Sequence, residues 1–130
     1  MRDRSTTYPV NMGDKFVFKA GWLVCQAKVL SSLNIADTPL ARRRGLIGQT
    51  KVETPLLIES CRWIHTFGVK CDLDIAYLDE EMRVIKIQTV RKQRVAMPVL
   101  KAKHVLEAGA GVFENWGLVV GHKLEARAND

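Results

Sequence analysis

The sequence predicts an α+β domain with a mainly antiparallel or mixed sheet and two short helices. About seven short apolar segments are rich in β-branched and aromatic residues, which is the composition of strands. Only two segments carry helix signals, and they do not alternate with the strands as helices do in a parallel α/β sheet. Because curling removes exposed strand edges, we expect the sheet to be strongly curled and barrel-like.

The N-terminal part predicts an arm followed by a β-hairpin. Residues 1–14 lack an apolar run, so we expect a flexible N-terminal arm. Lys15–Lys19 and Leu23–Leu30 have the composition of two strands. Ala20-Gly21 would form the turn between them, because glycine tolerates tight turns.

The first predicted helix follows this hairpin and has a well-marked start. Thr38 can accept hydrogen bonds from the first-turn amides as the N-cap, and Pro39 at the first helical position loses no needed donor. We expect the helix to end near Gly45 or Gly48.

The centre of the chain predicts a buried strand and then a second hairpin. Pro55–Glu59 is a short apolar run. Leu73–Leu78 is the most strand-like segment of the chain, and Asp79–Glu81 would form a polar turn after it. Val84–Val90 alternates apolar and polar residues, as a half-exposed strand does.

The C-terminal part predicts one more strand, a second helix and a closing strand. His104–Glu107 is strand-like, and Val112–Trp116 is a short helical segment that Gly117 would end. Residues 119–124 would turn into the closing strand.

The composition fits a single globular domain, which we place at residues 15–126, with 127–130 as a C-terminal tail. No apolar run approaches the roughly 20 residues that a membrane span needs. No apolar run follows the early arginines, as a secretory signal would require, so we expect a cytoplasmic protein. The three cysteines are an odd number without C-x-x-C spacing, which favours free thiols.

The stretch Cys61–Asp79 gathers polar side chains within strand-like apolar sequence, and we take it as the candidate site region. Asp74 is the first candidate in it, because both faces of its predicted strand are largely apolar. A carboxylate buried there needs a partner. It is either a structural group paired with an arginine or a group that binds a ligand or takes part in catalysis.

Two further hypotheses concern the cysteines of this stretch. Cys61, His65 and Cys71 could bind a metal if Asp72 or Asp74 supplied a fourth ligand, but the spacing matches no standard zinc pattern. A Cys–His nucleophilic pair would need the same residues within hydrogen-bond reach. Buried free thiols are the simpler interpretation, so we predict neither a metal nor a cofactor.

Several phrases, taken in order, resemble the prokaryotic domain of unknown function 192 family over Val24–Glu125. They are Thr38-Pro39, Arg42, Gly45–Gly48, Leu73–Asp79, Val105–Glu107, Gly111, Gly117-Leu118 and Gly121. The segment His65–Gly68 looks like a subgroup of that family. The resemblance implies no activity, because the family has none established. Its pattern makes Arg42 the expected partner of Asp74.

We predict a non-catalytic accessory module that binds a small anionic ligand or a partner protein. The expected ligand-binding residues are Arg42, His65, Thr66, Lys70 and Asp74. The alternative is a hydrolase-type enzyme in which His65 works with Asp72 and Asp74.

A third hypothesis is that the basic clusters bind anions or nucleic acid. It needs Arg42–Arg44 and Arg91–Lys103 to lie on one continuous surface. Solvated faces explain such short clusters more simply, so we do not expect nucleic acid as a partner.

Overall fold

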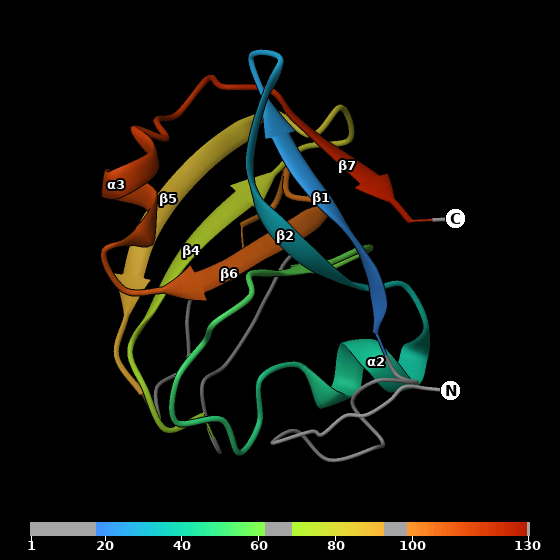
Figure 1. The fold of residues 1–130 in the computed structure, drawn as a ribbon, viewed down its shortest axis with the longest axis vertical. Helices are drawn as coiled ribbons and strands as arrows, with labels where there is room; N and C mark the ends of the chain where they lie inside the picture. Colours follow the sequence, from blue (N-terminus) through green and yellow to red (C-terminus); the bar gives the residue numbers. More distant parts are fainter. Residues whose placement is uncertain (1–17, 62–68, 93–98, 130) are drawn as a thin grey trace.

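In the part of the chain that the structure, a computed structural model, describes, a seven-stranded mixed sheet and two short helices form the fold (Figure 1). The structure describes residues 18–61, 69–92 and 99–129. The strands are β1 (Lys19–Cys25), β2 (Lys28–Ala36), β3 (Leu56–Ile58), β4 (Leu73–Leu78), β5 (Val84–Val90), β6 (His104–Gly109) and β7 (Leu124–Ala128), and the helices are α2 (Pro39–Arg44) and α3 (Val112–Trp116). The predicted α+β class is confirmed.

The sheet is open, so the predicted barrel-like curl is wrong. Its strand order is β5-β4-β6-β3-β2-β1-β7, with β5 and β7 at the two ends. Among the described strands, only β2 and β3 pair in parallel. The two end strands meet at one corner, where the Val84 amide donates to the His122 carbonyl at 2.8 Å and the Leu124 amide to the Met82 carbonyl at 2.9 Å. The contact includes one isolated bridge, between Arg83 and Lys123, and does not extend into a ladder that would close the sheet.

An N-terminal hairpin is present, but it is formed by β1 and β2 and not by the predicted strands. Its turn lies inside the predicted strand Leu23–Leu30, and most of the predicted strand Lys15–Lys19 lies outside the described residues. Gln26 and Ala27 make the turn, with φ angles of 52° and 66°. Ala20-Gly21 lies inside β1, where it pairs with β2 on one side and β7 on the other. A Cβ atom on Gly21 would come within 2.4 Å of the Arg127 carbonyl oxygen. Gly21 therefore serves close strand approach rather than a turn.

The signals for α2 are confirmed. The Ala41 amide donates to Thr38 Oγ1 at 3.1 Å, and Pro39 is the first helical residue. The helix ends at Arg44, because Gly45 adopts a φ of 49°.

The central hairpin also forms as predicted, with β4 and β5 at the expected bounds. Asp79 organises the turn between them, because its Oδ1 accepts from the amides of Glu81 and Arg83, each at 2.9 Å. Helix α3 has its predicted bounds, and β7 extends two residues into the predicted C-terminal tail.

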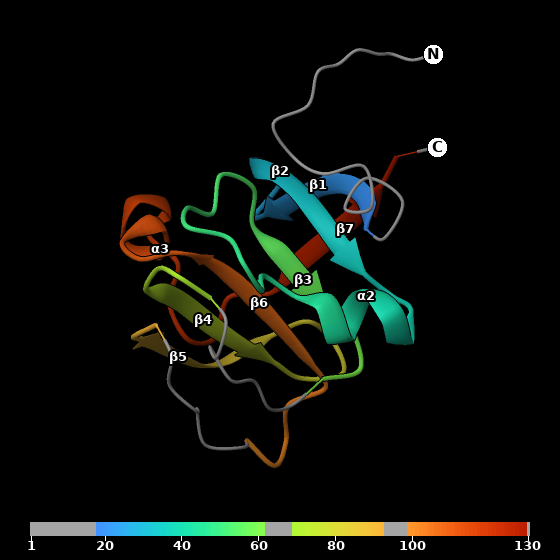
Figure 2. The same cartoon turned by 90° about the horizontal axis from the view of Figure 1, so that it is seen from below.

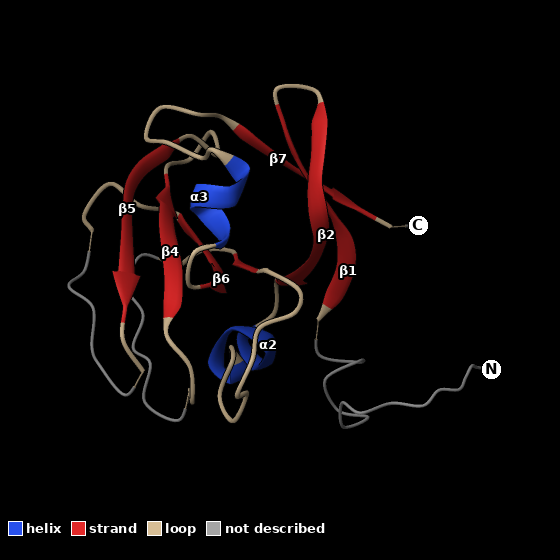
Figure 3. Ribbon diagram, turned by 60° about the vertical axis from the view of Figure 1, so that its left-hand side comes forward, coloured by secondary structure: helices blue, strands red, loops and turns tan. Residues whose placement is uncertain are grey.

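Two apolar clusters lie on opposite faces of β4, all of whose residues are buried. The first contains Leu73, Ile75 and Tyr77 together with Ala41 of α2 and Leu46, which follows that helix. The second contains Ala76 and Leu78, with Phe113 of α3 and residues of β1, β2 and β7. Figure 3 shows α3 between the β4–β5 side and the β1–β2 side of the molecule. No helix in the described part of the chain is long and apolar enough to cross a membrane.

Gly21→Val should lower the free energy of unfolding by about 1–3 kcal/mol, because β7 must move away from the added side chain. Urea denaturation measures this change. Ala20→Val is the matched control, since Ala20 is the exposed neighbour on the same strand and should change stability little. Equal effects of the two substitutions would contradict the close-approach role of Gly21.

Candidate functional site

Asp74 is buried, with 5% of its surface exposed, and both of its carboxylate oxygens are hydrogen-bonded. Thr89 Oγ1 on β5 donates to Oδ1 at 2.9 Å. The amides of Gly111 and Phe113, at the start of α3, donate to Oδ2 at 2.9 and 3.1 Å. A carboxylate with this many donors is satisfied without a cationic partner. Asp74 therefore fixes α3 and β5 to β4.

Arg42 is not the partner of Asp74, which corrects the pairing expected from the family resemblance. No hydrogen bond or ion pair among the described residues joins them. The positive charge of Arg42 acts instead on Asp37. The Lys19 ammonium, 2.9 Å from Asp37 Oδ2, is the main cause that lowers the pKa of Asp37, and Arg42 adds a smaller effect.

The other predicted site residues do not meet in one place. The Lys70 side chain is exposed, and its amide donates to the Gln49 carbonyl at 2.9 Å. Asp72 is exposed and accepts from the Lys92 amide at 3.0 Å. His65 and Thr66 lie outside the described residues, as does the rest of the predicted subgroup segment.

The metal hypothesis gains no support from the residues that the structure describes. They contain no group of three or more His, Cys, Asp or Glu side chains placed to hold a metal ion. Cys25, Cys61 and Cys71 have free thiols.

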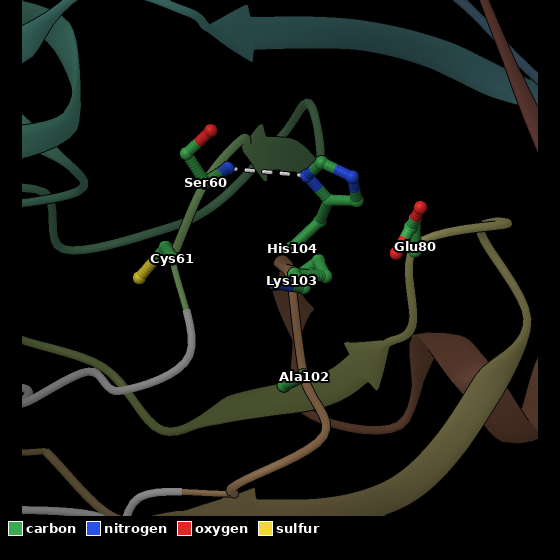
Figure 4. A pocket seen from close by; sticks show the side chains of 6 residues that line it. All are labelled: Ser60, Cys61, Glu80, Ala102, Lys103 and His104. Atoms are coloured by element: carbon green, nitrogen blue, oxygen red, sulfur yellow. Dashed lines mark hydrogen bonds between the residues drawn. The ribbon is translucent and has the colours of Figure 1, made fainter.

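A pocket of about 500 Å³ opens at a different place, where three strands begin or end (Figure 4). β3 ends at Ile58 and β4 at Leu78, and these residues pair with Val105 and His104 at the start of β6. The chain leaves the sheet three times at this edge, which leaves a hollow between the connections. Its lining residues are Ser60, Cys61, Glu80, Ala102, Lys103 and His104.

The imidazole of His104 has a fixed orientation in this pocket. The Ser60 amide donates to its Nδ1 at 3.1 Å, so the proton of the neutral ring sits on Nε2. Ser60 adopts a φ of 57°, a left-handed conformation that is uncommon for a residue other than glycine and is often found at functional sites. His104 was not among the residues predicted from the sequence, because nothing next to it in the chain indicates a function.

The pocket wall is held by main-chain hydrogen bonds. The Cys61 amide donates to the Lys103 carbonyl at 2.8 Å, and the Lys103 amide donates to the Leu78 carbonyl at 2.7 Å. The side chains of Lys103 and Glu80 are exposed, and no ion pair among the described residues joins them. One cation, one carboxylate and one imidazole N–H can therefore contact a molecule in the pocket.

The orientation of the side chains favours binding over nucleophilic catalysis. Figure 4 shows the Cys61 sulfur and the Ser60 hydroxyl pointing away from the imidazole of His104. A nucleophile must lie within hydrogen-bond reach of its base. Moreover, the nitrogen of His104 that could accept a proton is already bonded to the Ser60 amide.

A second buried carboxyl group, Glu107, lies in the middle of β6 and is 4% exposed. It sits between Leu56 of β3 and Ile75 of β4. No hydrogen bond among the described residues reaches this carboxyl, and burial raises the pKa of Glu107 to about 8. Burial also raises the pKa of Tyr77 to about 12, with smaller contributions from Cys61 and Glu107. The sequence contains a signal for the burial of Glu107, because this residue lies within an apolar strand-like segment just as Asp74 does.

The comparisons with known proteins point to one family. The model of the DUF192 family, described as an uncharacterized ACR, matches residues 23–126. A "UPF0127 protein" of Thermococcus gammatolerans is 33% identical over 87 residues, which cover 62% of this chain and 57% of the relative. A "UPF0127 protein" of Pyrococcus horikoshii is 26% identical over 111 residues, which cover 79% of this chain and 96% of the relative. In the first match, this chain thus spans little more than half of the relative's length.

Two crystal structures share the fold. One is a protein of unknown function from Novosphingobium aromaticivorans, with a TM-score of 0.68 and 18% identity over 83% of this chain and 84% of that one. The other is a proposed transcription regulator from Sinorhizobium meliloti, also with a TM-score of 0.68 and 18% identity, over 84% and 93%. At this identity the likeness extends to the fold alone.

Asp74→Asn should lower the free energy of unfolding by about 1–3 kcal/mol, because an amide cannot accept all three hydrogen bonds. Chemical denaturation measures the loss, and Asp72→Asn two residues away is the matched control. If both variants are as stable as the natural protein, Asp74 does not hold α3 in place.

Glu107→Gln should remove a pH dependence of stability. The pKa of Glu107 is raised to about 8 in the folded state from 4.5, so the unfolded chain releases this proton first as the pH rises. The contribution of Glu107 to the free energy of unfolding is therefore fully present below pH 4.5. It falls by about 1.4 kcal/mol per pH unit as the pH rises from 4.5 to 8.

Denaturation curves at several pH values test this expectation. The glutamine variant should match the natural protein near pH 4 and be more stable at pH 7, on the order of 3 kcal/mol. Exposed Glu114→Gln serves as the control. If the natural protein and the Glu107→Gln variant show the same pH dependence of stability between pH 5 and 8, Glu107 is not a buried neutral acid.

Proposed function

Because this chain belongs to the DUF192 family of uncharacterised proteins, we propose its function from its own geometry: it is a small-molecule-binding module. The ligand occupies the pocket at the start of β6. The observation that carries this proposal is the convergence of Lys103, Glu80 and His104 on one open cavity of about 500 Å³. Pockets that bind small molecules are commonly of roughly 300–1,000 Å³ and hold a few well-placed polar groups.

The polar groups of the pocket define the chemistry of the ligand. Lys103 offers a cation to an anionic group, and His104 Nε2–H offers a hydrogen-bond donor beside it. Glu80 accepts from hydroxyl or amino groups. A small polar molecule that carries an anionic group matches this set.

The proposed site retains the anionic ligand expected from sequence but moves it to other residues. Asp74 is sealed against α3 and cannot contact a ligand without losing its three donors. The module is non-catalytic in this proposal, because neither Cys61 nor Ser60 directs its side chain at His104. No described geometry favours the hydrolase alternative with Asp72 and Asp74.

Protein-detected NMR with a library of small carboxylates and phosphate esters tests the proposal. Bound compounds should shift the amide signals of residues 60, 61, 80 and 102–104. Lys103→Ala should weaken a carboxylate ligand about tenfold or more, because it removes a charge-assisted contact.

Adjacent exposed residues that do not line the pocket supply matched controls for this experiment. Lys101→Ala and Glu81→Ala should leave the affinity unchanged, whereas Lys103→Ala and Glu80→Ala should alter it. Signal shifts that cluster away from the pocket, or equal losses in the control variants, would sink the proposed site.

A further inference from the structure

The positive charge of the chain is concentrated at one end of the molecule. Three described segments, 39–53, 69–72 and 91–92, contain seven Lys and Arg residues against two Asp and Glu residues. The rest of the sequence contains thirteen against twelve, out of the totals of 20 and 14. Almost the whole net charge of +6 therefore belongs to these segments, which we call the α2 surface.

Hydrogen bonds hold the three segments side by side. The Lys70 amide donates to the Gln49 carbonyl at 2.9 Å, and the Lys92 amide donates to Asp72 Oδ1 at 3.0 Å. Figure 1 shows α2, the loop after it and the chain around residue 70 along the lower end of the molecule, and Figure 2 views that end directly. The α2 surface is thus one continuous region.

Four exposed cations of this surface form no ion pair with the residues that the structure describes. Arg43, Lys51, Lys70 and Lys92 are exposed, and none of them forms an ion pair with another described residue. In contrast, Lys19 forms an ion pair with Asp37. Unpaired exposed cations that outnumber acids attract a surface of negative charge.

Large aliphatic side chains are exposed among these cations. Leu40 is 62% exposed and Ile47 is 45% exposed, while Ala41 and Leu46 between them are buried. Leu40 and Arg43 lie three positions apart in α2, so they share its outward face. Exposed aliphatic groups surrounded by Lys and Arg are the composition of surfaces that rest on anionic lipid.

These features favour a lipid surface over nucleic acid. The segments contain no aromatic residue on which a base could stack. α2 has only six residues, a length of roughly 9 Å, which is short for reading a DNA groove. Exposed leucine and isoleucine gain little from a phosphate backbone but gain from burial at a headgroup boundary.

We propose that the α2 surface binds anionic phospholipid membranes peripherally, with Leu40 and Ile47 inserted at the headgroup boundary and the surrounding cations on the lipid charges. The binding is reversible, and it places the pocket-bearing edge of β6 away from the site of contact, because β4 separates residue 72 from residue 79 by its whole length.

Vesicle flotation with the full chain tests the proposal. The protein should float with vesicles of phosphatidylcholine and phosphatidylserine mixed 7:3 at low salt, and should not float with pure phosphatidylcholine. Each cation near such a surface contributes about 1 kcal/mol, or roughly fivefold. Arg43→Gln with Lys51→Gln should therefore weaken binding about 25-fold.

Two control comparisons make the outcome specific. Lys28→Gln with Lys123→Gln removes the same charge from exposed positions elsewhere and should change binding little. Leu40→Ser with Ile47→Ser keeps the charge and should still weaken binding at least about fivefold. Equal losses in the lysine control, or an unchanged serine variant, would overturn the proposal.

A binding measurement with nucleic acid completes the test. Fluorescence anisotropy with a labelled 20-base-pair DNA should show weak binding that does not depend on Leu40 and Ile47. Tight binding to DNA that falls in the Arg43 and Lys51 variant, together with no flotation on anionic vesicles, would assign the α2 surface to nucleic acid instead.

Discussion

The carboxylate of Asp74 is the contact on which the geometry of the C-terminal half depends. Both of its oxygens are used, one by Thr89 on β5 and the other by two amides at the start of α3. β4 is thereby joined to its neighbour and to the helix that follows β6. Since Phe113 of α3 belongs to the second apolar cluster, the same carboxylate also sets the position of that core. A charged group can be buried here only because main-chain donors replace the water it loses.

The two buried acids meet the same constraint in opposite ways. Asp74 lies on the α3 side of the sheet and is surrounded by donors. Glu107 lies on the other face, where burial favours the protonated form. The surroundings of the two groups differ: hydrogen-bond donors contact Asp74, whereas apolar neighbours enclose Glu107. One fold thus contains a carboxylate that organises structure and a carboxylic acid that stays neutral in an apolar environment.

Much of the fold could be predicted from the sequence, where local signals agree with tertiary contacts. The central hairpin, α3 and the Thr38 cap depend on alternation, turn residues and capping chemistry within a few positions. The prediction of a turn at Gly21 was wrong, because the residue that Gly21 approaches, Arg127, is 106 positions away in the sequence. The residues next to Gly21 do not indicate this contact. The prediction of a barrel-like sheet was wrong for the same reason, since strand order depends on pairing between segments far apart in the sequence.

The candidate site was harder to predict than the fold. The burial of Asp74 followed from its apolar strand, but its partners include main-chain amides, which every residue type carries. A charged partner was expected instead, and the family resemblance pointed to Arg42. His104 and Glu80 lie 24 positions apart and meet only because β4 and β6 pair. No local pattern could bring them together.

The short strand β3 has a consequence for how the chain folds. It pairs in parallel with Asn34–Ala36 of β2 and antiparallel with Val105–Glu107 of β6, segments about 70 residues apart. The β1–β2 and β4–β5 hairpins have close partners and can form early. The three residues of β3 gain both neighbours only after a long loop has closed, which costs chain entropy. We therefore infer that two locally folded parts of the chain join at β3. This joining step is the slow step of folding.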